Sequence, residues 1–228
     1  MKFYEQKGEF YFIQPRTDLI SLIPKNADNR VLEVGAGGGY TLIEIKKQNL
    51  AREVVGVELM EIPNSRQSDP AIDKFVISDV EKNDLDFPDA YFDVILMGDV
   101  MEHLIDPWEF LKKASRVLKK GGILIASMPN IRYYPALIKI FIKGDFGYES
   151  HGLFDKTHFR WYCKKNMKDL FDTAPMKCRS VFPRSRLYKV KWTKGVIFNK
   201  LTFGLFEEFL TLQYIIMRVL SFQFDTKS

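Results

Sequence analysis

The sequence predicts a doubly wound α/β fold with a mostly parallel β-sheet. Short runs rich in Val, Ile and Leu alternate with segments of helical periodicity between residues 30 and 127. The first of these runs is followed by a glycine-rich loop and a helix. Each of the next two runs has an acidic residue near its end. Strands that alternate with helices form parallel βαβ units with right-handed crossovers. Such crossovers bring the carboxyl ends of the strands to one edge, where ligands of these sheets bind.

The first 130 residues account for the parallel part of the sheet. Strands are expected, from their apolar content and length, at residues 30–34, 53–59, 74–80, 92–97 and 123–127. Helices are expected at residues 14–23, 40–50 and 107–119. The last of these has the clearest boundaries, because Asp106 suits its N-cap, Pro107 its first position and Gly121 its end.

The pattern changes after residue 130. We expect helices at residues 133–143 and 164–173, separated by a loop rich in Gly, Asp, aromatic residues and His. Two closing strands are expected at residues 176–183 and 209–217, the second antiparallel. The prediction is thus a single Rossmann-like domain, residues 1–228, with a seven-stranded sheet. Its first half, residues 1–130, contains the glycine loop. Its second half, residues 131–228, contains an insertion on the acceptor side of the ligand edge and the two closing strands.

Length and composition exclude several classes of protein. With 228 residues, 46% hydrophobic and 28% charged, the chain has the composition of a globular domain and not of a disordered one. No apolar run reaches the roughly 18 residues that a membrane span needs. Glu5 and Glu9 stand where an export signal would be apolar, and two cysteines make no disulfide framework. We therefore expect a cytoplasmic location.

The net charge of +5 is unevenly distributed along the chain. Residues 1–130 hold 16 Lys and Arg against 21 Asp and Glu, a net charge of −5, whereas residues 131–228 hold 18 against 8, a net charge of +10. Residues 156–200 alone hold 13 against 2. This basic stretch predicts an anionic ligand or an anionic membrane surface, with a solvated basic face as the alternative.

The glycine loop lies between the first strand and the next helix and reads Glu-Val-Gly-Ala-Gly-Gly-Gly from Glu33 to Gly39. Glycines there let a ligand contact the backbone and face the helix N-terminus. The dinucleotide fingerprint G-x-G-x-x-G would need a third glycine where this chain has Tyr40. A nicotinamide cofactor is therefore not favoured, and a simple tight turn is the structural alternative.

Further segments follow this loop in a recognisable order: VVGVEL, VISDVE, and GDVMEHLIDPWEFLKKASRVLKKGGILIASMPN. Together with VLEVGAGGGY they resemble the class I S-adenosylmethionine-dependent methyltransferases over residues 11–217. The resemblance implies S-adenosylmethionine (SAM) as cofactor and methyl transfer as the reaction. The cofactor-binding residues that it implies are Arg16, Glu33, Gly35, Ala36, Gly37, Gly39, Glu58, Leu59, Asp79, Val80, Gly98, Asp99, Val100 and His103.

The chemistry of these residue types agrees with that implication. Glu58 offers two oxygens for the ribose hydroxyls, and Asp79 with the Val80 amide offers an acceptor and a donor for adenine. Glu33 would lie near the methionine portion, and Arg16 would meet the methionine carboxylate through two hydrogen bonds. The alternatives are a solvated carboxylate for Glu58, a structural role for Glu33 and a surface position for Arg16.

One departure from the family follows the second strand. The family has a helix there, but residues 60–74 contain two prolines and no steady helical period. We expect this helix to be shortened or replaced by a loop.

The histidines mark the side of the methyl acceptor. His103, His151 and His158 are the only histidines in the sequence, and all three fall at or beyond the ligand edge. An imidazole titrates near neutral pH, so His103 and His158 are the candidate catalytic bases. The alternative for His103 is a wall of the cofactor site.

A narrower resemblance concerns the stretch GDFGYESHGLFDKTHFRWYCKKNMKDLF. It is similar to small methyltransferases associated with bacterial surface-polysaccharide and glycosyltransferase gene clusters. This implies O-methylation of a small or carbohydrate-like acceptor, with phosphorylated and lipid-linked forms included.

Two alternatives stay open. Asp99, Glu102, His103 and His158 also resemble the ligands of metal-assisted O-methyltransferases that act on RNA 2′-hydroxyls or quinone precursors, and would suit Mg or Mn. The preferred interpretation includes no metal. The chain would otherwise be a non-catalytic SAM-binding protein. Nucleic acid is not an expected partner, because the sequence has no RNA-recognition motif, and the oligomeric state is not predicted.

Overall fold

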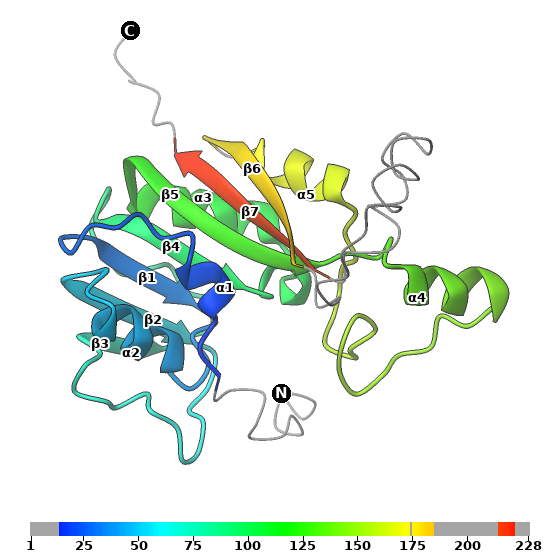
Figure 1. Cartoon of the computed structure of the whole chain (residues 1–228), viewed down its shortest axis with the longest axis horizontal. Coiled ribbons are helices and arrows are strands. Elements are labelled where there is room, and N and C mark those ends of the chain that lie inside the picture. Colours follow the sequence, from blue (N-terminus) through cyan, green and yellow to red (C-terminus); the bar gives the residue numbers. More distant parts are fainter. Residues whose placement is uncertain (1–13, 174, 185–213, 222–228) are drawn as a thin grey trace, which may run out of the picture.

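The computed structural model describes residues 14–173, 175–184 and 214–221 (Figure 1). Its sheet has the strand order β3-β2-β1-β4-β5-β7-β6. The five strands β1 (Arg30–Val34), β2 (Glu53–Glu58), β3 (Lys74–Ile77), β4 (Phe92–Gly98) and β5 (Leu118–Pro129) pair in parallel. This parallel part confirms the predicted Rossmann-like α/β fold. Because β1 pairs with both β2 and β4, the strand order reverses there, which is where such sheets bind ligands.

The other two strands are β6 (Met176–Arg184) and β7 (Tyr214–Ser221). β7 lies between β5 and β6 and runs antiparallel to both. It continues four residues beyond the predicted end at residue 217, and residues 209–213 of that prediction lie outside the described residues.

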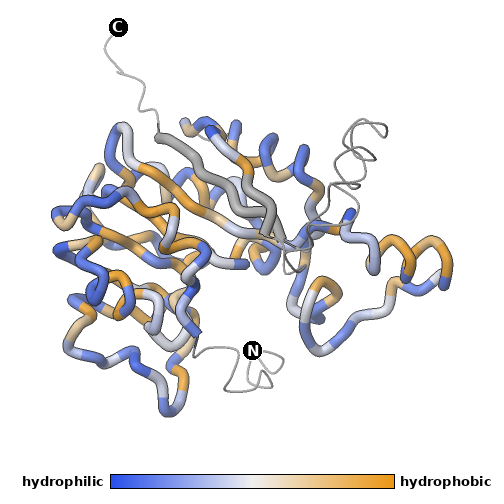
Figure 2. Tube along the Cα trace, in the orientation of Figure 1, coloured by the Kyte–Doolittle hydropathy of each residue, from blue (hydrophilic) through white to orange (hydrophobic). Residues whose placement is uncertain are grey.

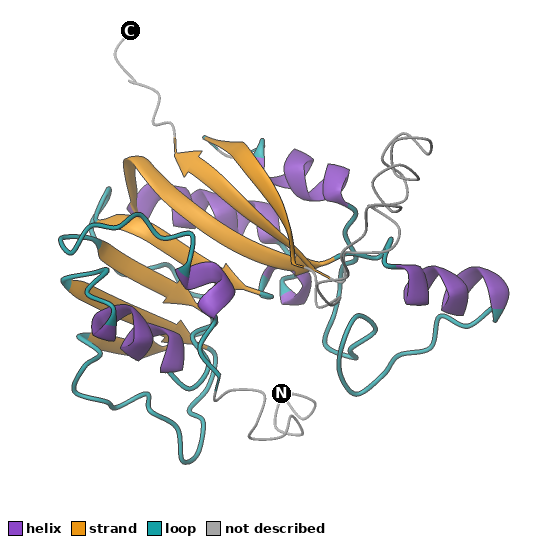
Figure 3. Cartoon of the chain, in the orientation of Figure 1, coloured by secondary structure: helices purple, strands orange, loops and turns teal. Residues whose placement is uncertain are grey.

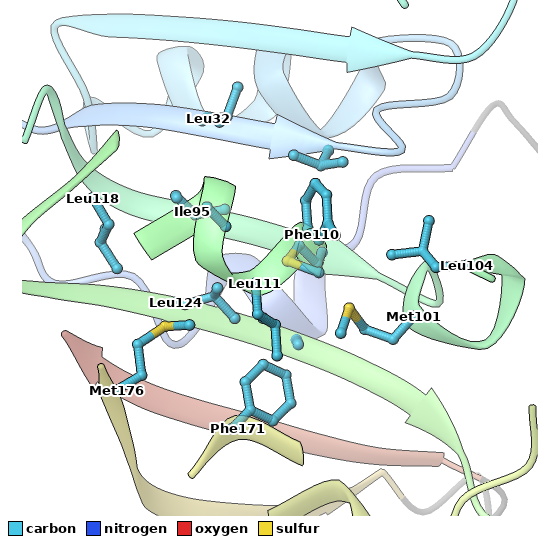
Figure 4. Close-up of a cluster of buried hydrophobic side chains, with 14 of the residues drawn as sticks. Leu32, Ile95, Met101, Leu104, Phe110, Leu111, Leu118, Leu124, Phe171 and Met176 are labelled. Atoms are coloured by element: carbon cyan, nitrogen blue, oxygen red, sulfur yellow. The ribbon is translucent and has the colours of Figure 1, made fainter. Parts of the chain in front are cut away.

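Helices cover both faces of the sheet (Figure 3). Residues of α1 (Thr17–Ile20) and α2 (Tyr40–Lys47) pack in one buried apolar cluster, and residues of α3 (Pro107–Val117) and α5 (Lys164–Phe171) pack in another. Neighbouring strand residues alternate between the two clusters. Figure 4 shows the second of them, to which Leu32, Phe110 and Phe171 belong. The apolar runs of the sequence are therefore continuous because both faces are buried.

The ends of several elements differ from the prediction. Asp106 caps α3, since its side chain accepts a hydrogen bond from the Glu109 amide at 3.0 Å. The helix nevertheless ends at Val117, so the predicted end at residue 119, with Gly121 after it, is wrong, and Gly121 lies within β5. Leu118 is fully buried, adopts an extended conformation and pairs with Phe92, so tertiary pairing starts β5 there.

Other predicted elements are also shorter, and one predicted loop is confirmed. α1 spans only Thr17–Ile20, because Pro24 and the residue before it disfavour helix. The second helix ends three residues early, at Lys47, and β3 ends at Ile77. Residues 59–73 contain no helix, as predicted.

Residues 131–162, which we call the arm, project from the carboxyl end of β5 (Figure 1). The arm contains α4 (Tyr134–Leu137) and the π-helical turn η3 (Ile138–Ile142), which together fill the helix predicted at 133–143. It returns to the body where Asn130 forms a bridge with Tyr162 and the Ile131 amide donates to the Tyr162 carbonyl at 2.9 Å. Within the part of the chain that is described, no helix is long and apolar enough to cross a bilayer.

Candidate functional site

A cleft of about 400 Å³ opens at the carboxyl ends of β1, β2 and β4. Its volume falls in the range of small-molecule sites. Seven of the predicted site residues line it: Gly35, Glu58, Leu59, Asp79, Val80, Val100 and His103. The others, Arg16, Glu33, Ala36, Gly37, Gly39, Gly98, Asp99 and His158, lie behind or beside this lining.

The glycine loop needs its glycines on steric grounds. Gly35 has a φ of +70°, and a Cβ there would lie 2.6 Å from the Val100 Cγ2. Gly39, the N-cap of α2, has a φ of +84°, and its Cβ would lie 3.1 Å from the Arg66 carbonyl oxygen. Since any side chain would clash or strain the backbone, the loop presents bare backbone to the cleft.

Glu58 is buried at the end of β2 and shapes this loop. Its two oxygens accept hydrogen bonds from the Gly37 amide at 2.7 Å and the Leu59 amide at 2.8 Å. A carboxylate has about four lone-pair sites, so Glu58 retains the capacity to accept from a ribose diol in the cleft. The position matches the predicted role.

Asp79 lies just beyond β3 and lines the cleft. The Lys82 ammonium bonds to it at 2.7 Å and lowers the pKa of Asp79 from its ordinary value. The carboxylate is therefore ionised at neutral pH and acts only as an acceptor, which suits an adenine amino group. Nearby Glu81, missed from the sequence, accepts from the Ile105 and Asp106 amides and so positions the wall of the cleft after β4.

Glu33 is buried beneath the glycine loop. Burial raises its pKa to about 8, although the Thr41 hydroxyl and the charge of Arg16 oppose that rise. One of its oxygens, Oε2, is fully buried and has no hydrogen-bond partner among the described residues. A nearby cation or a water molecule stabilises a buried carboxyl oxygen of this kind. The predicted cofactor is a cation and would bind on this side of the sheet.

Arg16 and Asp99 form an ion pair. Arg16 donates to Asp99 at 3.0 Å, to Ser127 at 2.8 Å and to Asp18, while Ser127 donates to Asp99 at 2.6 Å. Burial disfavours the charge of Arg16, but the Asp99 and Asp18 carboxylates outweigh it and raise the pKa of the guanidinium. Gly98 makes room for this contact, because a Cβ there would lie 2.5 Å from Arg16 Nη1. The network ties α1 to β4 and β5 behind the cleft.

The two candidate bases lie in contact. The rings of His103 and His158 meet edge to face with their centroids 4.7 Å apart, although 55 positions separate them in the sequence. His103 Nδ1 lies 3.1 Å from the Thr157 carbonyl oxygen, and His158 Nδ1 lies 3.0 Å from that of Leu153. A carbonyl only accepts, so each Nδ1 carries the hydrogen and each neutral ring has an acceptor at Nε2.

Glu102 completes this cluster. Its Oε1 lies 4.0 Å from His158 Nε2, and one ligand atom from each of Glu102, His103 and His158 lies within 4.8 Å of the others. Asp99, the fourth member of the metal-ligand set considered from the sequence, is turned toward Arg16 and Ser127 instead. His151 is exposed beside Ser150 and takes no part.

The return segment of the arm forms a wall that sequence reasoning missed. Lys156, Thr157 and Phe159 line the cleft. The Phe159 amide donates at 2.9 Å to the Glu102 carbonyl in the turn η2 (Met101–His103), which docks this segment on the body. His158 within this segment and the narrower resemblance of the surrounding stretch were its signals in the sequence.

The residues fit the predicted cofactor. The glycine loop leaves a cradle that a side chain would fill, Glu58 and Asp79 offer acceptors at the strand ends, and buried Glu33, which holds a proton at neutral pH without a ligand, would ionise beside a cation. SAM combines a ribose diol, an adenine amino group and a cationic sulfonium. Each group therefore has a complementary residue at this edge of the sheet.

Comparisons with known proteins agree with this site. A family model described as a methyltransferase domain matches residues 6–181. The chain is 32% identical over 111 residues to the 27-O-demethylrifamycin SV methyltransferase of Amycolatopsis mediterranei, covering 46% of this chain and 40% of that protein. It is 32% identical over 105 residues to a ubiquinone biosynthesis O-methyltransferase of Maricaulis maris, covering 44% and 41% of the two chains.

The fold has close counterparts among solved structures. A SAM-dependent methyltransferase from Archaeoglobus fulgidus superposes with a TM-score of 0.59 at 20% identity, covering 90% of this chain and 92% of that one. This likeness concerns the fold alone. The chain spans about two fifths of the length of the curated relatives it matches. With the family model covering most of the chain, this protein belongs to the SAM-dependent methyltransferase family.

Proposed function

We propose that this chain methylates an oxygen of a small or carbohydrate-like acceptor, with SAM as the methyl donor. The observation that supports the proposal most directly is the contact between His103 and His158 beside the cofactor cleft. A backbone carbonyl accepts from Nδ1 of each ring, which leaves Nε2 of each neutral ring as the proton acceptor. O-methylation of a hydroxyl needs a base that removes one proton. The relatives named above that act on oxygen support the reaction type.

Each residue of the site has a separate role in this proposal. Bound SAM supplies an activated methyl carbon. Glu58, Asp79 and the glycine loop would hold its nucleoside in the cleft. His103 lines the cleft, and its Nε2 takes the proton of the acceptor hydroxyl. His158, buried behind it, positions the ring of His103.

The acceptor enters along the arm in this proposal. Lys156 and Phe159 line the cleft on that side, offering a cation and an apolar ring. A ring face with a nearby ammonium suits a sugar that bears an anionic group. The resemblance to methyltransferases of surface-polysaccharide clusters supports the same class. In the basic stretch of residues 156–200, Lys164 and Lys165 begin α5, and Lys165 pairs with Asp169 at 2.8 Å. Residues 185–200 of this stretch lie outside the described residues.

Replacing His103 with Asn is expected to lower methyl transfer about 10²–10⁴-fold, the usual contribution of a general base. Asn cannot take up the proton but occupies a similar volume. The measurement is turnover of labelled SAM with a panel of nucleotide sugars and polyprenyl-linked sugars. Affinity for S-adenosylhomocysteine, measured in parallel, separates loss of the base from loss of a cofactor contact, since His103 lines the cofactor cleft. His151→Asn is the matched control, because His151 is exposed away from the cleft. Full turnover in His103→Asn would exclude His103 as the base.

A specific observation favours a second candidate, metal-assisted O-methylation. Glu102, His103 and His158 offer one ligand atom each within 4.8 Å, and both imidazoles direct Nδ1–H to a backbone carbonyl. Metal-binding histidines have this arrangement in most proteins. A carboxylate with two imidazoles suits Mn²⁺ or Mg²⁺ bound together with water or an acceptor oxygen.

Mn²⁺ titration of the full chain, followed by electron paramagnetic resonance, separates the two candidates. A metal site predicts saturable binding that disappears in both Glu102→Gln and His158→Asn. The control is Glu109→Gln, an exposed carboxylate on α3. Absence of binding, together with turnover that survives EDTA, would leave the metal-free base as the mechanism.

A further inference from the structure

The helical part of the arm has two apolar faces. Ala136 and Ile140 face the small buried cluster of the arm, together with Leu153 and Phe154. Ile138, Phe141 and Ile142 follow one another at helical spacing and are 40%, 77% and 78% exposed. Figure 2 shows the hydrophobic colouring that runs along this projecting helix. An ordinary surface helix carries one such stripe, so the outward face needs a separate explanation.

The fold of the arm does not use the outward face. Trp161 donates to the Leu153 carbonyl at 3.0 Å, and the Phe146 ring meets Phe154 and Trp161 edge to face at 5.4 and 5.1 Å. Lys139 lies 4.4 Å from the centre of the Phe154 ring and bonds to the Gly147 carbonyl at 2.8 Å. These contacts hold the arm together on its inner side. Phe141 and Ile142 would leave water only on contact with something outside the described chain.

Charge identifies what covers that face. The arm, residues 131–162, holds 5 Lys and Arg against 3 Asp and Glu, a net charge of +2, whereas residues 14–130 hold 14 against 19, a net charge of −5. At the tip, Asp145 and Glu149 both pair with Lys139, while exposed Lys143 directly follows Ile142. An anionic surface therefore attracts the arm and repels residues 14–130, which carry the cofactor cleft.

We propose that the arm binds the surface of an anionic lipid bilayer. Phe141 and Ile142 insert into the interface, Ile138 lies along it, and Lys143 meets the phosphates. A second copy of the chain is a poorer partner, because two arms of the same positive charge would repel each other. The return segment that includes Lys156 and Phe159 would then hold the cleft mouth near the lipid. This inference goes beyond methyl transfer and does not depend on it.

Vesicle flotation of the full chain tests the proposal. Vesicles of phosphatidylcholine with phosphatidylglycerol should carry the protein, phosphatidylcholine alone should carry little, and added salt should weaken binding. The double variant Phe141→Ser/Ile142→Ser should lose roughly 100-fold in partitioning, since two large apolar side chains leave the interface. The matched control is Ile105→Ser, which removes a side chain that is 64% exposed on the body and should bind normally.

Each outcome decides the proposal. Binding of anionic vesicles that is lost in the double variant but kept in Ile105→Ser supports it. No vesicle binding by the wild type, or equal binding by the double variant, overturns it. A concentration-dependent dimer that only the double variant loses, without vesicle binding, assigns the face to self-association instead. Unchanged S-adenosylhomocysteine affinity shows that the variants are folded, and keeps this test separate from that of the proposed function.

Discussion

Replacing Glu58 with Ala is expected to weaken SAM binding more than 100-fold. A hydrogen bond to a charged group contributes about 1.5–3 kcal/mol, and the proposed ribose contact has two. The same carboxylate holds the Gly37 amide at 2.7 Å, so its loss also loosens the glycine loop. Isothermal titration with SAM and with S-adenosylhomocysteine measures the effect.

Two controls accompany that measurement. Glu53→Gln alters the carboxylate at the opposite end of β2, where it accepts from the Tyr91 hydroxyl at 2.9 Å, and should leave affinity unchanged. Thermal unfolding of Glu58→Ala establishes that the variant is folded. Wild-type affinity in a folded Glu58→Ala protein would mean that the ribose lies elsewhere, and the cofactor assignment of the β2 edge would be wrong.

Replacing Glu33 with Gln is expected to stabilise the cofactor-free protein above pH 5, increasingly so up to pH 8. Burial raises the pKa of Glu33 from about 4.5 to about 8 in the folded state. The folded state therefore holds a proton that the unfolded state has released in this pH range. The free energy of unfolding is therefore not reduced by Glu33 below about pH 4.5, where both states hold the proton. It falls as the pH rises from there through about 8.

The size of this loss follows from the same pKa values. It is on the order of 4 kcal/mol at pH 8, which is large compared with the 5–15 kcal/mol total stability of a domain. Gln cannot ionise, so urea unfolding of Glu33→Gln should show none of this decline between pH 5 and pH 8. Glu44→Gln, which removes a partly exposed carboxylate from α2, serves as the control. Parallel pH profiles for wild type and Glu33→Gln would show that Glu33 is ionised in the fold at no energetic penalty.

Much of the cofactor edge was predictable because it depends on short-range patterns and a general rule of topology. A glycine loop after β1 and acidic residues after β2 and β3 are local signals, and parallel βαβ units bring such strand ends together. Gly35, Glu58 and Asp79 accordingly line one cleft. Asp106 likewise marked the start of α3 through local hydrogen bonding.

Contacts between residues far apart in the chain could not be predicted from the sequence. The local pattern predicts a longer α3, but pairing of Leu118 with Phe92 converts its last turn into strand. Arg16 is a plausible cofactor ligand by motif, and only the folded chain shows it bound to Asp99 and Ser127. The wall formed by Phe159 depends on a backbone bond to Glu102, for which no side-chain pattern exists.

By itself the sequence determined the α/β fold, through its periodicity, and the cofactor edge, through the glycine loop and the resemblance of its motifs to the family. Only the tertiary structure decided which distant residues meet. It brought His103 and His158 into contact across 55 positions, assigned their Nδ1 hydrogens through two carbonyls, and left Phe141 and Ile142 facing outward. The physical reason is that such contacts arise from the docking of the arm on the end of β4. That docking depends on backbone hydrogen bonds and packed side chains far apart in the sequence, not on any local preference.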